Sequence, residues 1–260
     1  LMLSGLVLFP VFHGDRAVVG HYFSMYELGF FSLVLTAFLL PSQLLHKVYD
    51  SLFISPLSKA FQQRDRFESQ QFLIWYSLFA LSTAYVLFSI LLGPWLFIFL
   101  FGEKYEPGLE VLPWIVLMVS VRILRIATSM LALATAKPYC ELYANLVRAS
   151  ALPIAIIGLA MGYPIECVPI AGIIGEVLAL FVGLVSLNLP VSHAVKPPAV
   201  SGMIMLWLAS MVFITAEIVI DINPPYVSAT LAAVLLITMI LFFIKQYPKF
   251  TIERGFQNDV

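Results

Sequence analysis

Two arginines lie near the middle of an apolar stretch that is long enough to cross a membrane. The stretch is Leu112–Ala134, and the charges are Arg122 and Arg125. A charged arginine at the centre of a bilayer costs about 2.5–3.5 kcal/mol on insertion scales, so two of them need an acidic partner, a water-filled cavity or an anionic ligand. The planar guanidinium group binds carboxylates and phosphates through paired N–H donors. The pair therefore predicts an anion-facing site.

The next two apolar segments add ionisable side chains at broadly similar depth. Arg148 follows Asn145 by three residues and Glu141 by seven, which gives a polar stripe along one helix. Glu176 is near the middle of the following segment. Arg148 and Glu176 form either an ion pair that only holds helices together or a part of the same cavity. Three arginines against Glu176 leave an expected surplus of positive charge, which favours an anionic ligand.

Lys47 and Asp50 lie three residues apart on the first long helix, toward its cytoplasmic end. They are expected to pair on the helix surface, and Lys47 is also a fourth candidate cation for the cavity. The candidate cavity residues are therefore Arg122, Arg125, Arg148 and Lys47, and the candidate charge partners are Glu176, Asp50 and Asn145. We expect Arg122 and Arg125 to face the interior of the bundle and not lipid.

The composition indicates a membrane protein. The hydrophobic fraction is 61% and the charged fraction 11%, against about 45–50% and 25% in soluble domains. A net charge of -1 gives no basic field for nucleic acid. The histidines are scattered singly, and there is no phosphate-binding loop or metalloprotease motif, so neither an enzyme, a metal site nor a cofactor is expected. Cys140 and Cys167 bracket a predicted helix and are too far apart for a disulfide.

Apolar runs of about 20 residues predict an all-α, polytopic integral membrane bundle of seven full transmembrane helices plus a partial N-terminal one. The partial helix is 1–12, and the full spans are 18–54, 71–101, 109–134, 139–161, 169–189, 200–220 and 226–244. We expect a kink at Pro41 and a break at Gly93–Pro94. Residues 13–20 and 102–108 are expected to be turns, and residues 55–70 a polar loop.

The loop charges predict the orientation. One set of connections, with the C-terminal tail, contains eight Lys and Arg residues, and the alternate set contains two. Because cytoplasmic loops carry the excess of basic residues, the tail is expected in the cytoplasm.

Three motifs resemble a known family. Asp15-Arg16-Ala-Val-Val-Gly20-His-Tyr22, followed by Glu27-Leu28-Gly29, resembles the entry to the second half of polysaccharide exporters. Pro41 with Ser55-Pro56-Leu57-Ser58 resembles the kinked long helix of that family and its cytoplasmic end, and Phe101-Gly102-Glu-Lys-Tyr105 resembles its next turn. The chain is thus similar to the multidrug/oligosaccharidyl-lipid/polysaccharide (MOP) exporter superfamily, and most similar to its O-antigen flippase-like branch.

The resemblance implies an organisation and an activity. Residues 1–190 would form a C-terminal six-helix lobe with a truncated first helix, 191–245 an appended helix pair, and 246–260 a cytoplasmic tail. The missing N-terminal lobe would be a partner. The implied function is translocation of a lipid-diphosphate-linked oligosaccharide across the bacterial cytoplasmic membrane by alternating access, with membrane lipid as surroundings and possible H+ or Na+ coupling.

Two other functions compete with this one. A cation-coupled multidrug antiporter would need acidic residues facing its substrate, whereas the mid-membrane balance expected here is positive. An integral-membrane glycan-processing enzyme would need clustered acidic or histidine side chains at a membrane face. The scattered histidines do not provide such a cluster.

Overall fold

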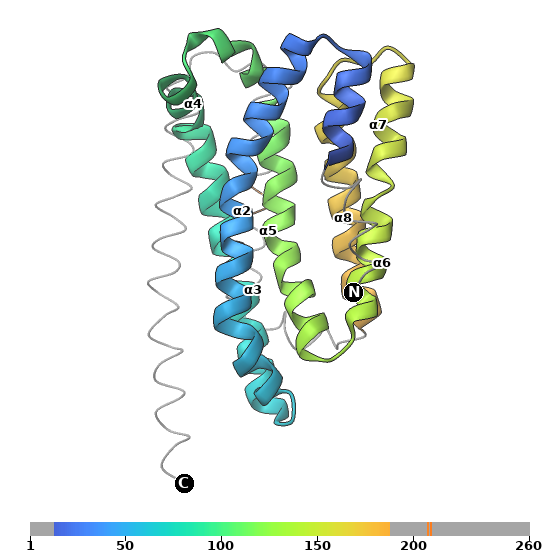
Figure 1. The fold of residues 1–260 in the computed structure, drawn as a ribbon. Coiled ribbons are helices and arrows are strands. Elements are labelled where there is room, and N and C mark those ends of the chain that lie inside the picture. The colour runs from blue at the N-terminus through green and yellow to red at the C-terminus, as the bar shows by residue number, and fades with distance from the viewer. Residues whose placement is uncertain (1–12, 188–206, 208, 210–260) are drawn as a thin grey trace.

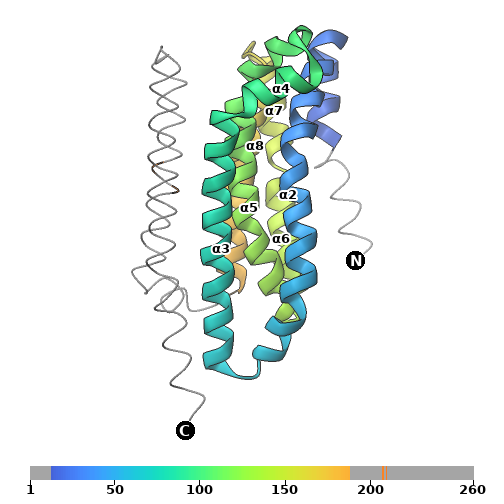
Figure 2. The same ribbon diagram turned by 90° about the vertical axis from the view of Figure 1, so that its left-hand side faces the viewer.

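The computed structural model describes residues 13–187 together with Trp207 and Ala209, and it shows an elongated bundle of helices that run along a common axis (Figures 1 and 2). In chain order the elements are a helix over 13–22, α2 (Met25–Ala60), α3 (Arg64–Leu91), α4 (Gly93–Phe101), the 3-10 helix η1 (Glu103–Glu110), α5 (Leu112–Ala134), α6 (Pro138–Arg148), α7 (Ala151–Ala160) and α8 (Cys167–Leu187).

The first helices are divided at Ser24. Ser24 Oγ accepts a hydrogen bond from the Glu27 backbone N–H at 3.3 Å, and Glu27 Oε2 accepts from the Ser24 backbone N–H at 2.8 Å. This reciprocal pair is a capping box, which ends one helix and starts the next. The predicted turn over 13–20 is therefore wrong, because these residues are helical, and the predicted span from 18 to 54 begins instead at Met25.

The connection between α2 and α3 is short. α2 continues through Pro41 and Pro56, and α3 begins at Arg64, so the polar loop predicted for 55–70 is wrong. At 36 residues, α2 is roughly 54 Å long at 1.5 Å per residue, which exceeds the ~30 Å hydrocarbon core of a bilayer. A helix of this length can project from the membrane at one end.

The break predicted at Gly93–Pro94 is confirmed, because α3 ends at Leu91 and α4 starts at Gly93. The predicted turn over 102–108 is an eight-residue 3-10 helix instead. Gly102 precedes it with φ of +88°, a conformation that glycine adopts without steric cost.

The span predicted over 139–161 consists of two helices, α6 and α7, and Pro153 explains the division. Proline has no N–H to donate to the carbonyl four residues earlier, and its ring clashes with that carbonyl. That carbonyl belongs to Ala149, and it accepts instead from the Leu152 N–H at 3.2 Å. The two helices together cover Pro138–Ala160, which is still long and apolar enough to cross a membrane.

α5 is the central helix of the bundle, and 94% of the residues in its most apolar 18-residue stretch are buried. It packs against α2 and α3 on one side and against α6 and α8 on the other. Its closest neighbour, α8, approaches through small residues. A Cβ on Gly172 would lie 2.5 Å from Met118 Sδ, and a Cβ on Gly175 would lie 2.9 Å from Ala151 Cβ. Gly172 therefore permits the close approach of α8 to α5, and Gly175 permits its close approach to α7.

A second pair of glycines, Gly158 and Gly162, lies at the end of α7 and just after it. A Cβ on Gly158 would lie 3.2 Å from Cys167 Sγ, so this glycine does permit close packing. Gly162 has nothing within 4 Å, and its φ is +85°. It therefore serves the left-handed turn after α7 and not a helix–helix contact. Cys140 and Cys167 are free, as predicted.

Five helical stretches of the described part are long and apolar enough to cross a membrane, and they correspond to the first five predicted full spans. The predicted spans 200–220 and 226–244, the partial helix 1–12 and the tail lie outside the described residues, apart from Trp207 and Ala209. Trp207 contacts α3, where its Nε1 donates to Ser82 Oγ at 2.9 Å.

Candidate functional site

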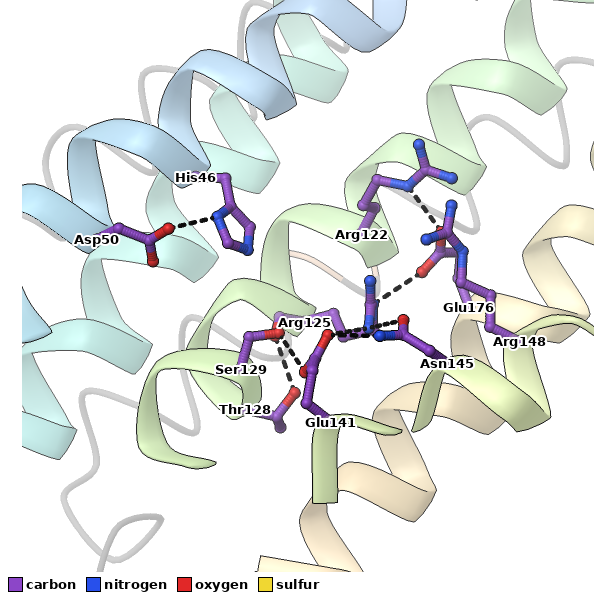
Figure 3. Close-up of polar contacts among 10 residues, drawn as sticks. All are labelled: His46, Asp50, Arg122, Arg125, Thr128, Ser129, Glu141, Asn145, Arg148 and Glu176. Carbon is purple, nitrogen blue, oxygen red and sulfur yellow. Dashed lines mark hydrogen bonds and ion pairs between the residues drawn. The ribbon is translucent and has the colours of Figure 1, made fainter. Parts of the chain in front are cut away.

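A buried ionic cluster connects α5, α6 and α8 (Figure 3). We call it the arginine cluster, and its members are Arg122, Arg125, Glu141, Asn145, Arg148 and Glu176. The three-residue spacing on α5 directs Arg122 and Arg125 to one helix face, as expected. Close packing of the glycines of α8 against α7 and α5 brings Glu176 within reach of that face.

Glu176 is the centre of the cluster. Its Oε1 accepts from Arg122 Nε at 2.7 Å and lies 2.8 Å from Arg148 Nε, so the predicted contact between Arg148 and Glu176 is confirmed. Its Oε2 lies 3.1 Å from Arg125 Nε, at the distance of an ion pair but without the alignment of a hydrogen bond. Three guanidinium groups from two helices thus converge on one carboxylate of a third helix.

The arginine side chains are inside the bundle. The exposed fraction of the side chain is 14% for Arg122, 10% for Arg125 and 5% for Arg148, and it is 1% for Glu176. The expectation that Arg122 and Arg125 face the interior is confirmed. Buried charges are tolerated where they are paired and hydrogen-bonded, and this arrangement meets that condition.

Arg125 also connects α5 to the start of α6. Its Nη1 donates to Glu141 Oε1 at 3.2 Å and to Asn145 Oδ1 at 3.1 Å. Asn145 Nδ2 donates to Glu141 Oε1 at 3.1 Å, and Ser129 Oγ donates to Glu141 Oε2 at 2.6 Å. Glu141 is therefore a second acid of the cluster, and its side chain is 27% exposed. The sequence pattern placed it on the polar stripe without giving it a charge role.

A third acid faces the cluster from the helix over 13–22. Asp15 lines a small cavity of about 20 Å³ together with Arg122, Arg148 and Glu176. Sequence reasoning missed Asp15 as a site residue, because the segment that carries it was interpreted as a polar turn. Its place in the exporter-like motif was the signal that could have identified it.

The expected surplus of positive charge is therefore wrong. Arg122, Arg125 and Arg148 meet three acids and not one, so the formal charges at this site balance. Two of the acids were undercounted because a sequence gives depth along a helix but not which neighbouring helix faces the charge.

Lys47 and Asp50 do not pair as predicted. Asp50 Oδ2 lies 2.9 Å from Nδ1 of His46, four residues earlier on the same face of α2. Lys47 is exposed on α2, and the buried ion pairs of the arginine cluster do not include it. Neither Lys47 nor Asp50 is brought to the cluster.

Part of the hydrogen-bonding capacity of Arg122 is directed away from Glu176. Arg122 reaches Glu176 through Nε, and its two terminal nitrogens point away from that carboxylate (Figure 3). Such nitrogens suit the oxygens of a phosphate or carboxylate. Between residues 13 and 187 no three His, Cys, Asp or Glu side chains are grouped to hold a metal ion.

Residues 1–110 match a family model described as polysaccharide biosynthesis protein. The match covers less than half of the chain, and it supports the resemblance to polysaccharide biosynthesis membrane proteins that the motifs indicated. The matched range includes Asp15 and ends before α5, so the three arginines lie outside it. Comparisons with curated proteins and with solved structures give no significant match.

Proposed function

We propose that the chain is the C-terminal part of a transporter that moves a lipid-diphosphate-linked oligosaccharide across the bacterial cytoplasmic membrane by alternating access. The polysaccharide biosynthesis match and the five membrane-length helices support a membrane protein that handles polysaccharide. In this proposal an N-terminal lobe completes the transport path, and the C-terminal tail is cytoplasmic.

The observation that carries the proposal is the convergence of Arg122, Arg125 and Arg148 on Glu176 inside the bundle. Here a single carboxylate is shared by three guanidinium groups, each of which has five N–H donors. A diphosphate offers several more acceptor oxygens and can replace or supplement Glu176 when the lobe changes conformation.

Competition between the Glu176 carboxylate and the substrate diphosphate for the arginines would make the affinity for substrate depend on the conformation of the lobe. When Glu176 holds the arginines, the site is self-neutralised and stable without substrate. When the arginine N–H groups donate to the substrate diphosphate instead, α6 and α8 lose the ion pair between Arg148 and Glu176. A ligand shifts a conformational equilibrium only by its difference in affinity between the two states, and this competition supplies such a difference.

Double replacement of Arg122 and Arg125 by Ala in the full-length protein tests the proposal. We expect loss of surface polysaccharide and accumulation of lipid-linked precursor, with normal amounts of the protein in the membrane. Lys47→Ala is the matched control, because Lys47 is a cation of a neighbouring helix outside the cluster; it should export normally. Unchanged export in the double variant would show that the arginines are structural only.

A cation-coupled multidrug antiporter is the second candidate, and the acids of the cluster favour it more than the sequence did. Glu141 is 27% exposed and sits next to Arg125, so it could meet a cationic substrate. Glu141→Gln separates the two functions. Loss of drug resistance with normal polysaccharide would support the antiporter, whereas normal drug resistance with altered polysaccharide would support the oligosaccharide transporter.

A further inference from the structure

The Asp15 carboxylate is carried by a helix of its own. The capping box at Ser24 gives α2 a start of its own, and the backbone between the two helices is only residues 23 and 24. One side-chain hydrogen bond also joins them, from Arg16 Nη2 to Thr36 Oγ1 of α2 at 2.7 Å. Packing holds this helix against the start of α7. A Cβ on Gly14 would lie 2.5 Å from Leu152 Cδ1, so only glycine permits this approach without displacing Leu152.

The contact at Gly14 brings Asp15 to the arginine cluster. Asp15 lines the same small cavity as Arg122, Arg148 and Glu176, beside the break that ends α6. Without Asp15, three arginines would face only Glu141 and Glu176, and one positive charge would remain. Asp15 supplies the missing negative charge from outside the three helices that form the cluster.

The cavity has no room for a second large anion in this conformation. Its volume is about 20 Å³, and about 10–15 Å³ on such a measure is needed for one water molecule. A phosphate group could reach Arg122 and Arg148 from this side only if Asp15 moved away. Such a movement would break the exposed hydrogen bond from Arg16 to Thr36 of α2, whereas α2 would keep its own cap at Ser24.

We propose that Asp15 is a tethered counter-anion: it occupies the position beside Arg122 and Arg148 that the phosphate of an anionic ligand takes, and the ligand binds in competition with it. The proposal rests on the proposed function, because it assigns a regulator to the same arginine site. It predicts that the protein without ligand binds anions weakly, because Asp15 competes for Arg122 and Arg148. It also predicts that movement of the helix over 13–22 exposes these arginines.

Binding of farnesyl diphosphate, a short polyprenyl diphosphate, to the purified full-length protein in lipid nanodiscs tests this. Asp15→Asn keeps the shape and removes the charge, so its dissociation constant should fall about tenfold relative to the native protein. Glu103→Gln is the matched control, since Glu103 is an exposed carboxylate of η1, and its affinity should be unchanged. Arg122→Gln should lose binding in both the native and the Asp15→Asn backgrounds.

A disulfide lock provides a second measurement that does not depend on how Asp15→Asn folds. Gly14→Cys with Leu152→Cys, in a background of Cys140→Ala and Cys167→Ala, joins the helix over 13–22 to α7, because the Gly14 Cβ position lies 3.1 Å from Leu152 Cγ. The oxidised protein should bind farnesyl diphosphate at least tenfold more weakly than the reduced protein. Either single-cysteine variant should show no redox effect.

The outcomes separate this inference from the proposed function. If neither the native protein nor Asp15→Asn binds the probe, or if binding survives Arg122→Gln, the arginine site itself is refuted. If binding needs Arg122 but Asp15→Asn binds equally or more weakly, or if the lock has no effect, the arginine site stands and the tethered counter-anion is refuted.

Discussion

The two sides of α5 are held in different ways. Toward α6 and α8 the contact contains the arginine cluster, with ion pairs between 2.7 and 3.2 Å. Toward α2 and α3 it is apolar, with isolated hydrogen bonds nearby such as that from Ser82 Oγ to the Ser120 carbonyl at 2.8 Å. Figure 2 shows α5 between these neighbours.

The difference has a physical basis. Lipid tails are as apolar as leucine, so apolar helix faces in a membrane gain little from each other beyond close packing. The α2–α3 side is therefore a fixed packing surface with little specificity in its chemistry. The α6–α8 side is joined by charges that can exchange partners, so we infer that movement and ligand binding belong to this side.

The largest expected effect comes from removing the shared acid. Glu176→Ala leaves Arg122, Arg125 and Arg148 without their common acceptor. Breaking a buried charge pair by removing one partner costs about 3–5 kcal/mol of unfolding free energy. SDS-induced unfolding in detergent micelles would measure it. A loss as small as that of an exposed substitution such as Glu103→Gln would mean that the two sides of α5 do not differ.

The next effect concerns the close approach of α8. Gly175→Val would place a Cβ 3.0 Å from the Arg148 carbonyl oxygen, a backbone atom that cannot move aside easily. Overpacking of this kind typically costs about 1–3 kcal/mol, and the shift of α8 should also weaken the contacts of Glu176.

Gly29→Ala is the matched control for this prediction. A Cβ at Gly29 of α2 has nothing within 4 Å, so the change should be neutral or stabilise by up to about 1 kcal/mol through helix propensity. Thermal unfolding followed by circular dichroism would compare the two. Equal effects would argue against a tight α8 contact.

A smaller effect is expected in the coupling between Arg148 and Glu176. Because their atoms are 2.8 Å apart, the double Ala variant should lose less than the sum of the two single variants. Contacting residues typically couple by about 0.5–3 kcal/mol. The same cycle between Lys47 and Glu176 should be additive. Strict additivity for Arg148 and Glu176 would contradict the shared-acid geometry.

The smallest effect is on the apolar side. Ser82→Ala removes the donor to the Ser120 carbonyl and the acceptor of Trp207 Nε1. Hydrogen bonds between membrane helices average about 0.6 kcal/mol, so we expect a loss of about 1 kcal/mol in SDS unfolding. Trp207→Phe, which removes one of the two bonds, should lose about half as much. If Ser82→Ala lost as much unfolding free energy as Glu176→Ala, the α2–α3 side of α5 would not be the less specific of the two sides.

The sequence predicted which residues matter at the site better than it predicted how they pair. Spacing and depth were enough to place Arg122 and Arg125 on one inward face and to bring Arg148 to Glu176. Hydrophobic runs were also enough to find the five described spans. Partner choice depends on which helices are neighbours, and periodicity does not contain that information. The missed contacts of Asp15 and Glu141 follow from this.

Some of the missed features did have local signals. Ser24 followed by Glu27 is a capping-box pattern, and it could have divided the first span. Pro153 inside the predicted span 139–161 could have predicted the break after Arg148. By contrast, the continuous passage of α2 through Pro41 has no local signal, because a proline in a long membrane helix is compatible with either outcome.

The break at Pro153 also has an electrostatic consequence. It makes α6 a separate eleven-residue helix, with Glu141 in its first turn and Arg148 in its last. The peptide dipoles of a helix leave partial positive charge at its start and partial negative charge at its end, so both residues are at the end that favours their charge. A proline five positions beyond Arg148 thereby places this cation at the end of a helix, where the peptide dipoles favour positive charge. Pro153 contributes to the site through the backbone, although it is not one of the cluster's charges.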